Sequence, residues 1–297
     1  MAQECLRVDD DRPLRQGDVF LATSEHVDVW SRRGIIVTAD CDIAHGKHRD
    51  IISFVPVIAA TDYLHLFTLP SLLRKATKPV EDESLASMRR AQSDVNAGAK
   101  PISTEAAREW VARAPPAEIV EDLRVRDARE KEHLTSLLSS WGAACRAANP
   151  GTFAEMMRGV VYLRARTVKN TDIETIYRKL WADLHTALGS LPGDAFFIND
   201  LDDGHADDHG FVAYLRLVRE IRPAEIAIRQ ADFADTQVRA RRVSHLQSPY
   251  IYRITQQLAD VFCAIGLPKE YEERRAGTMS LLADRHRAGV SGGEEWA

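Results

Sequence analysis

Residues 38–48 hold the densest group of side chains in this chain that could do chemistry. Cys41, Asp42, His45 and His48 lie within this short polar stretch, directly after an apolar strand pattern. Thiolate, imidazole and carboxylate groups bind zinc, and a histidine or an aspartate can also transfer a proton. Loops at strand ends commonly carry binding residues, so we expect this stretch to lie near the functional surface.

A metal site in this stretch would use Cys41, His45 and His48 as ligands. Their spacing matches no known zinc signature, and the sequence offers no obvious fourth ligand. The other interpretation is that Cys41 packs against the fold while both histidines face solvent. We favour this second interpretation and expect no metal and no cofactor.

A second group of candidates is basic and aromatic. Arg239, Arg241 and Arg242 stand close together without an acidic neighbour, and Tyr250 follows them. Such residues could hold phosphates and stack on a base, which makes them candidate nucleic-acid-binding residues. An exposed edge strand whose charges discourage aggregation explains the arginines equally well. Both interpretations remain open.

Two stretches of the chain have similar sequences, and we expect them to form the strands that position these side chains. Residues 16–20 (Gln-Gly-Asp-Val-Phe) return as residues 192–196 (Pro-Gly-Asp-Ala-Phe), and Gly34 and Gly210 then open a second apolar strand in each copy. The offset between the copies is constant, so an internal duplication of one small β unit is a hypothesis. Chance remains the alternative, because Gly-Asp is a common turn dipeptide.

The remaining patterns predict an α+β fold built from small β-barrel units, a long helical insertion and a C-terminal helix. Strands are expected at residues 18–22, 34–38, 51–58, 195–199, 211–218 and 225–228, and helices at residues 104–112, 117–148 and 172–188. The predicted organisation is a β unit (14–70), a connector broken by two prolines (71–101) that could contain one short helix at 85–95, a helical segment (102–190), a second β unit (191–245), a C-terminal helical segment (246–285) and a disordered tail (286–297).

Composition narrows the possible classes of protein. The chain has 297 residues, of which 45% are hydrophobic and 28% charged, and its formal charge is −5. No apolar run approaches the roughly 20 residues of a membrane span, so we expect no membrane association. The acidic start of the chain is unlike a secretory signal, and the four cysteines form no CxxC pair. These features predict a cytoplasmic location and reduced thiols.

The first β unit resembles the MazF/PemK family of toxin ribonucleases. The resemblance spans residues 14–62 and rests on residues 17–20 (Gly-Asp-Val-Phe), residues 33–38 (Arg-Gly-Ile-Ile-Val-Thr) and residues 55–58 (Val-Pro-Val-Ile). It implies an SH3-like barrel that cleaves RNA without a metal, with an arginine and a hydroxyl side chain at the phosphate. Arg33 matches the arginine, whereas Ile58 stands where the family has its hydroxyl residue.

The resemblance leads to three hypotheses about function. The first is a bacterial protein of toxin–antitoxin or phage-defence type that recognises RNA or a protein partner through the barrel without efficient catalysis. The second is a MazF-like ribonuclease that uses Arg33 with Asp42, His45 or His48 as the base. The third is a metal-dependent hydrolase built on residues 41–48. Apolar faces of the predicted helices could bind a protein partner or a second copy of the chain.

Overall fold

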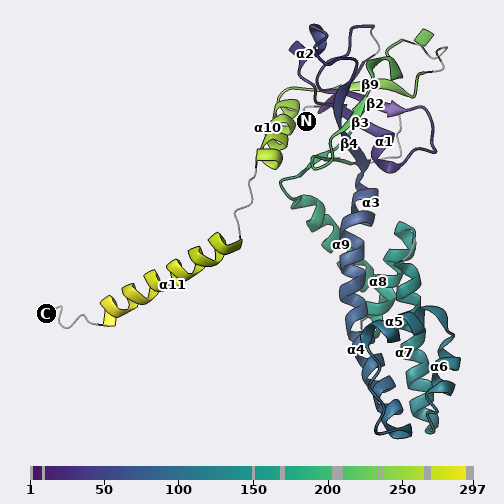
Figure 1. Ribbon diagram of the computed structural model, residues 1–297. Coiled ribbons are helices and arrows are strands. Elements are labelled where there is room, and N and C mark those ends of the chain that lie inside the picture. The colour runs from purple at the N-terminus through teal and green to yellow at the C-terminus, as the bar shows by residue number, and fades with distance from the viewer. Residues whose placement is uncertain are drawn as a thin grey trace.

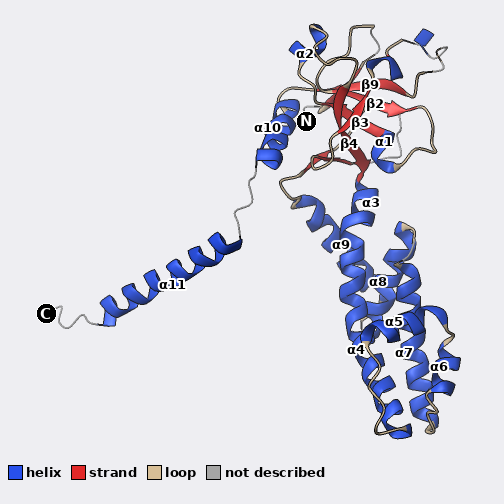
Figure 2. Ribbon diagram, viewed as in Figure 1, coloured by secondary structure: helices blue, strands red, loops and turns tan. Residues whose placement is uncertain are grey.

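Apolar strands gather at one end of the molecule and helices extend from it as an arm, which gives an α+β architecture (Figures 1 and 2). The computed structural model describes residues 3–8, 11–148, 151–167, 171–202, 210–229, 231–232, 235, 237–263 and 269–291. The predicted α+β class is therefore confirmed.

The strands form one curled, mostly antiparallel sheet. Its order is β1 (Cys5–Arg7), β9 (Ala240–Leu246), β2 (Asp18–Ala22), β3 (Arg33–Ile36), β4 (Ile52–Ala59), β6 (Phe211–Tyr214) and β5 (Ala195–Ile198). Two short strands complete it: β7 (Arg219–Ile221) pairs with the start of β4, and β8 (Ile226–Ala227) runs parallel to β9. Both predicted β units thus belong to one sheet, joined where β4 pairs with β6.

Side chains of each strand alternate between two apolar cores. Val19 and Val55 point to the face that α10 (Tyr250–Cys263) covers with Ile251. Phe20 and Phe54 point to the opposite face, where their rings meet edge to face with centroids 4.9 Å apart. This alternation is the period of two that a strand buried on both faces imposes.

The two β units are not equivalent in detail. Phe20 pairs with Gly34 across β2 and β3, whereas Phe196 pairs with Ala213, and not with Gly210, across β5 and β6. This shift of three residues is odd in number, so it places corresponding side chains on opposite faces. The backbones also differ, because Gly210 has a φ of +80° and Gly34 has no positive φ. The structure therefore gives the duplication hypothesis no support.

The arm is a bundle of helices with its own core, inserted between β4 and β5 (Figure 1). It consists of α3 (Ala60–Tyr63), the π-helical segment η1 (Leu64–Thr68), α4 (Leu69–Val95), α5 (Thr104–Arg113), α6 (Pro116–Asp122), α7 (Ala128–Ala147), α8 (Phe153–Thr167) and α9 (Ile173–Gly189). The predicted helix at 104–112 is confirmed, and the predicted run at 117–148 is two helices separated by residues 123–127.

The predicted connector at residues 71–101 is wrong, because α4 runs through most of it despite Pro79. An internal proline removes one helical hydrogen bond and costs about 3 kcal/mol. The helix offsets this cost by burying an apolar stripe that includes Leu69, Leu73 and Met88 against the other helices of the arm. The helical segment therefore begins at Ala60 and not at residue 102.

Local capping signals in the sequence set several boundaries of the arm. Asp127 accepts a hydrogen bond from the amide of Glu130 at the start of α7, and Asp172 does the same for Thr175 at the start of α9. Such side-chain acceptors satisfy amides that have no partner within the helix.

The apolar faces predicted to bind a partner are used in different ways. The face of α7 that contains Leu134 and Trp141 is buried inside the arm. On α9, Leu180 is buried, but Tyr177 and Trp181 remain exposed, and the ring of Trp181 lies 6.3 Å from that of Phe153 in α8. Burial within the chain therefore accounts for the apolar face of α7, but only for part of the apolar face of α9.

Two helices and three small elements complete the described chain. They are α1 (Val29–Arg32), α2 (Asp40–Ala44), the 3-10 turn η2 (Pro223–Glu225), α10, and α11 (Lys269–Ser291), which extends away from the sheet (Figure 1). The predicted tail at residues 286–297 is wrong in its first part, because α11 reaches Ser291. Residues 292–297 lie outside the described residues. Among the helices of the described chain, none has the length and apolar character that crossing a bilayer requires.

A substitution at Gly34 tests how closely the sheet is packed. A Cβ atom at this position would overlap the rings of both Phe20 and Phe54. We expect Gly34→Ala to lower the free energy of unfolding by about 1–3 kcal/mol, as overpacking does elsewhere. Urea denaturation measures the change, and Gly189→Ala is the control because an added Cβ there meets nothing within 4 Å. Equal stability of both variants would contradict the described packing.

Candidate functional site

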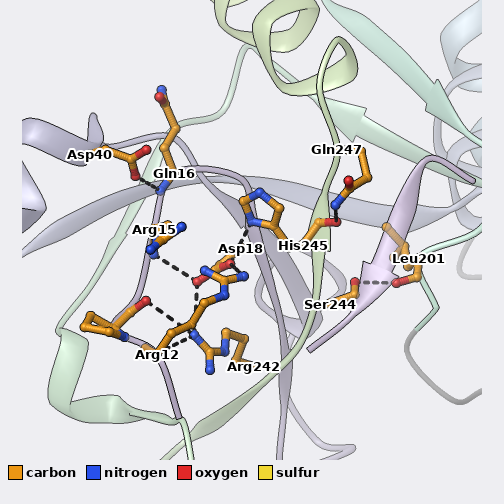
Figure 3. A network of polar contacts seen from close by, with 11 residues as sticks. Arg12, Arg15, Gln16, Asp18, Asp40, Leu201, Arg242, Ser244, His245 and Gln247 are labelled. Atoms are coloured by element: carbon orange, nitrogen blue, oxygen red, sulfur yellow. Dashed lines mark hydrogen bonds and ion pairs between the residues drawn. The ribbon is translucent and has the colours of Figure 1, made fainter. Parts of the chain in front are cut away.

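Asp18 is the centre of a polar network at one corner of the sheet (Figure 3). The residue is fully buried, and both oxygens of its carboxylate accept hydrogen bonds. Oδ1 lies 2.8 Å from Nδ1 of His245 and 3.0 Å from Nη2 of Arg12. Oδ2 accepts from the amide of Arg15 at 2.9 Å and lies 3.4 Å from Nη1 of Arg242. A buried carboxylate needs such partners, because it has lost its hydration.

The turn before β2 fixes the position of Asp18. Gly17 has a φ of +89°, a conformation that favours glycine, and its amide donates to the carbonyl of Ile36 at 2.8 Å. The preceding residue, Gln16, donates its amide to Oδ1 of Asp40 at 2.7 Å. The start of α2 is thereby attached to the same corner of the sheet.

The surroundings of Asp18 decide its protonation state. Burial raises the pKa of this carboxyl, but the hydrogen bonds from His245 and from the Arg15 amide, together with the charges of Arg12 and Arg242, outweigh burial. The net effect is a pKa below the ordinary value of 3.8. Asp18 is therefore a stable anion at neutral pH.

Arg242 takes part in this network and is not a free phosphate-binding residue. Its side chain is only 1% exposed, and Nη1 also donates to the carbonyl of Arg12 at 2.8 Å. Of the other predicted nucleic-acid contacts, Arg239 is exposed and lies 3.3 Å from Glu225, while Arg241 and Tyr250 are half-buried. The expectation that the three arginines share one binding surface is therefore wrong for Arg242.

His245 is held in a single orientation by Asp18. Because the ionised carboxylate can only accept, Nδ1 of the ring carries the proton in this contact. In the neutral ring Nε2 is then a proton acceptor, and the side chain remains 24% exposed. An oriented, partly exposed imidazole can bind a phosphate oxygen when protonated or act as a base when neutral.

Arg33, the residue that the resemblance places at the phosphate, is buried. Only 5% of it is exposed, and its guanidinium lies 5.0 Å from the centroid of the Phe211 ring. The strand that carries it lies in the middle of the sheet, between β2 and β4. Arg33 is therefore not an accessible cation that could hold a phosphate beside Asp42, His45 or His48.

The residues predicted near the end of β3 form a short helix and a turn, not an open loop. Cys41 and Asp42 lie in α2, with Sγ of Cys41 3.7 Å from Oδ1 of Asp42. His45 ends this helix, and Nδ1 of His48 is buried without a hydrogen-bond partner. Within the ranges that the structure describes, no three histidine, cysteine, aspartate or glutamate side chains gather as a metal-binding group. Cys41, His45 and His48, the candidate ligands of the less favoured metal interpretation, are thus not brought together.

Sequence reasoning missed the role of Asp18 and His245, which lie 227 residues apart in the chain. The Gly-Asp dipeptide identified the turn but gave no sign that the carboxylate is an acceptor for two arginines and a histidine. The available signal was a histidine in a strand directly before the buried Leu246, since a polar side chain beside buried positions needs a partner.

A group of aromatic side chains joins the arm to the sheet, and it too was not predicted. The ring of Phe67 in η1 stacks on Tyr214 of β6 with centroids 5.2 Å apart, and Trp30 of α1 lies 5.3 Å from the same tyrosine. Tyr63 contacts Phe67 at 4.9 Å. Aromatic pairs of this kind stabilise a contact by about 0.5–1.5 kcal/mol beyond burial.

Comparisons with known proteins give no relative for this chain. No model of a protein family matches it, and neither the curated proteins nor the solved structures provided a match. Function is therefore inferred from the geometry of the site and from the motifs in the sequence.

Replacing Asp18 tests whether the network holds the sheet together. We expect Asp18→Asn to lower the free energy of unfolding by about 3–5 kcal/mol, because Arg242 would stay buried without its anion. Asp82→Asn is the matched control, since Asp82 is exposed and pairs with an exposed lysine. That exposed pair contributes less than about 1 kcal/mol. Similar urea midpoints for both variants would contradict a supporting role for Asp18.

The pH dependence of stability provides a separate test. A carboxyl whose pKa is lowered on folding stabilises the protein above its ordinary value of 3.8, and this contribution is lost as the pH falls below 3.8 towards the folded-state value. The wild type should therefore lose stability more steeply than Asp18→Asn between about pH 5 and about pH 2. Denaturant titrations at several pH values measure both slopes, and parallel slopes would count against the lowered pKa.

Proposed function

We propose that the corner around Asp18 binds the phosphate backbone of single-stranded RNA and does not cleave it efficiently. The observation that carries the proposal is the local charge. Among the residues that the structure describes, three arginines (Arg12, Arg15 and Arg242) and His245 lie around two carboxylates, those of Asp18 and Asp40, so these side chains together carry a positive surplus in an acidic protein. Such a local surplus is what backbone recognition requires.

Arg15 is the residue of this corner best placed for a phosphate. Its amide is held by Asp18, while the residue as a whole is exposed and its guanidinium makes no ion pair with any described residue. His245 is bound to the same carboxylate of Asp18 through Nδ1, which leaves its Nε2 available for a ligand. The backbone of Arg15 is already fixed, so binding of an anion would order only its side chain, and the guanidinium provides paired N–H donors for phosphate oxygens.

The choice of RNA as the ligand follows from the resemblance of residues 14–62 to MazF/PemK toxins. Within this proposal the curled sheet is an SH3-like barrel, and the protein acts in the bacterial cytoplasm as a toxin or a phage-defence component. Support for this step comes from the motif spacing and from the three consecutive antiparallel strands β2, β3 and β4.

Binding without efficient cleavage is favoured over the ribonuclease alternative. A MazF-like reaction needs an accessible arginine and a proton-transfer group at the scissile phosphate. Arg33 is buried against Phe211, and Ile58, at the position of the family's hydroxyl residue, is 1% exposed. If the protein is nonetheless a nuclease, His245 is the described residue that is oriented as a base.

Charge reversal at Arg15 tests the proposal. We expect Arg15→Glu to weaken binding of a fluorescein-labelled single-stranded RNA 20-mer by about five- to tenfold and to reduce the slope of log K against log salt by about 0.7. Arg90→Glu is the matched control, because Arg90 is an exposed arginine on the arm and its replacement changes the net charge equally. Fluorescence anisotropy at two or more salt concentrations provides both quantities.

Equal weakening by the two variants would show a general charge effect and would contradict a site at this corner. Absence of RNA binding by the wild type would also overturn the proposal. The exposed apolar side chains of α9, Ile173, Tyr177 and Trp181, would then be the better-supported surface, for a protein partner. Cleavage of the same RNA in EDTA that is lost in His245→Asn would replace binding with the ribonuclease alternative.

A further inference from the structure

The helical arm contains a pocket that the RNA-binding proposal does not use. It has a volume of about 520 Å³ and lies between α4, α5, α7 and α8. Its floor is apolar and is formed by Leu73, Trp141 and Met156, which are all buried. This size lies in the range of pockets that hold small molecules.

Charged side chains gather on one side of this floor. Glu81 is 5% exposed and accepts two hydrogen bonds from Arg108, from Nε at 3.1 Å and from Nη2 at 2.7 Å. Lys78 contacts Asp82 at 2.6 Å and lies 3.9 Å from Glu81. Arg74, one helical turn before Lys78, is exposed and makes no ion pair within the described chain.

The charges that line the pocket therefore leave a positive surplus. The lining contains one carboxylate, Glu81, and three cationic side chains, Arg74, Lys78 and Arg108. Asp82, which is not part of the lining, forms an ion pair with Lys78. Glu81 uses two of the five N–H donors of Arg108, so further donors remain for an incoming anion. An apolar floor beside unpaired cationic donors is complementary to an amphipathic anion.

We propose that this pocket binds a small amphipathic carboxylate, with its apolar chain on Trp141 and Leu73 and its head group at Arg74 and Arg108. The polar groups fix the orientation of the ligand, and the floor provides apolar burial. The pocket lies in the core of the arm, so this ligand binds independently of the corner around Asp18.

Cys145 gives a probe inside the pocket. This half-buried thiol lines the cavity, and burial together with the charge of Glu81 raises its pKa. Cys41 and Cys263 are exposed and lie outside the pocket, so they are internal controls in the same chain. The full-length protein is labelled with N-ethylmaleimide with and without decanoate, and the modified peptides are counted by mass spectrometry.

We expect saturating decanoate to slow labelling of Cys145 at least fivefold and to leave Cys41 and Cys263 unchanged. Arg74→Glu should raise the decanoate concentration for half protection about fivefold, the size of effect that reversing one exposed charge produces. Arg90→Glu on the same helix should leave it unchanged. Uncharged decanol, which has the same chain, should protect at least fivefold more weakly.

Three results would overturn the proposal. Protection by decanol equal to that by decanoate would show that the head group is not recognised. An unchanged half-protection concentration in Arg74→Glu would remove Arg74 from the site. Equal slowing at Cys41 and Cys263 would mean that decanoate acts on the whole protein and not in the pocket. RNA binding by the same samples reports separately on the corner around Asp18.

Discussion

The burial of one carboxylate sets the strongest constraint on this structure. Asp18 lies inside the protein as an anion, and this is tolerable only because four donors from separate parts of the chain converge on it. Two of these donors, Arg242 and His245, belong to β9, which the chain completes after the whole arm. The sheet therefore reaches its low-energy form only when its last long strand is in place.

The arm is compatible with this constraint because it leaves and rejoins the same region of the sheet. The chain exits after β4 at Ala59 and returns as β5, which is separated from β4 only by β6. The sheet therefore holds both ends of the insertion two strands apart, and the entropy of loop closure grows only slowly with the length of an insertion. The stacked rings of Phe67 and Tyr214 fix the arm at the same junction.

Local patterns in the sequence predicted the elements well and their partners poorly. A continuous apolar run after the Gly-Asp turn identified β2 at its observed bounds, and Asp172 marked the start of α9. Pro79 led to a wrong connector, because the buried stripe of α4 is visible only when the rest of the arm is known. Local propensity is routinely overridden by such tertiary packing.

The candidate site was harder to predict than the fold, because its geometry depends on pairing between distant strands. The register that aligns Asp18 with His245 is set across β2 and β9, and no local pattern specifies it. The same pairing turns Arg242 from an apparent surface cation into a buried counter-ion. The burial of Arg33 could not be predicted for a related reason. Its neighbour Phe211 lies in β6, which follows the whole arm in the sequence.

Two separate cores give the sheet and the arm different reasons to be stable. The arm depends on apolar helix packing around Trp141, whereas the sheet combines apolar burial with the charge network of Asp18. Protonation of Asp18 therefore lowers the stability of the sheet and has no direct electrostatic effect on the arm. The chain passes from the sheet to the arm without an intervening loop, since α3 begins at the residue after β4 and continues through η1 into α4. The contact between the rings of Phe67 in η1 and Tyr214 in β6 lies at this junction, so the aromatic group is where the two separately stabilised parts of the protein meet.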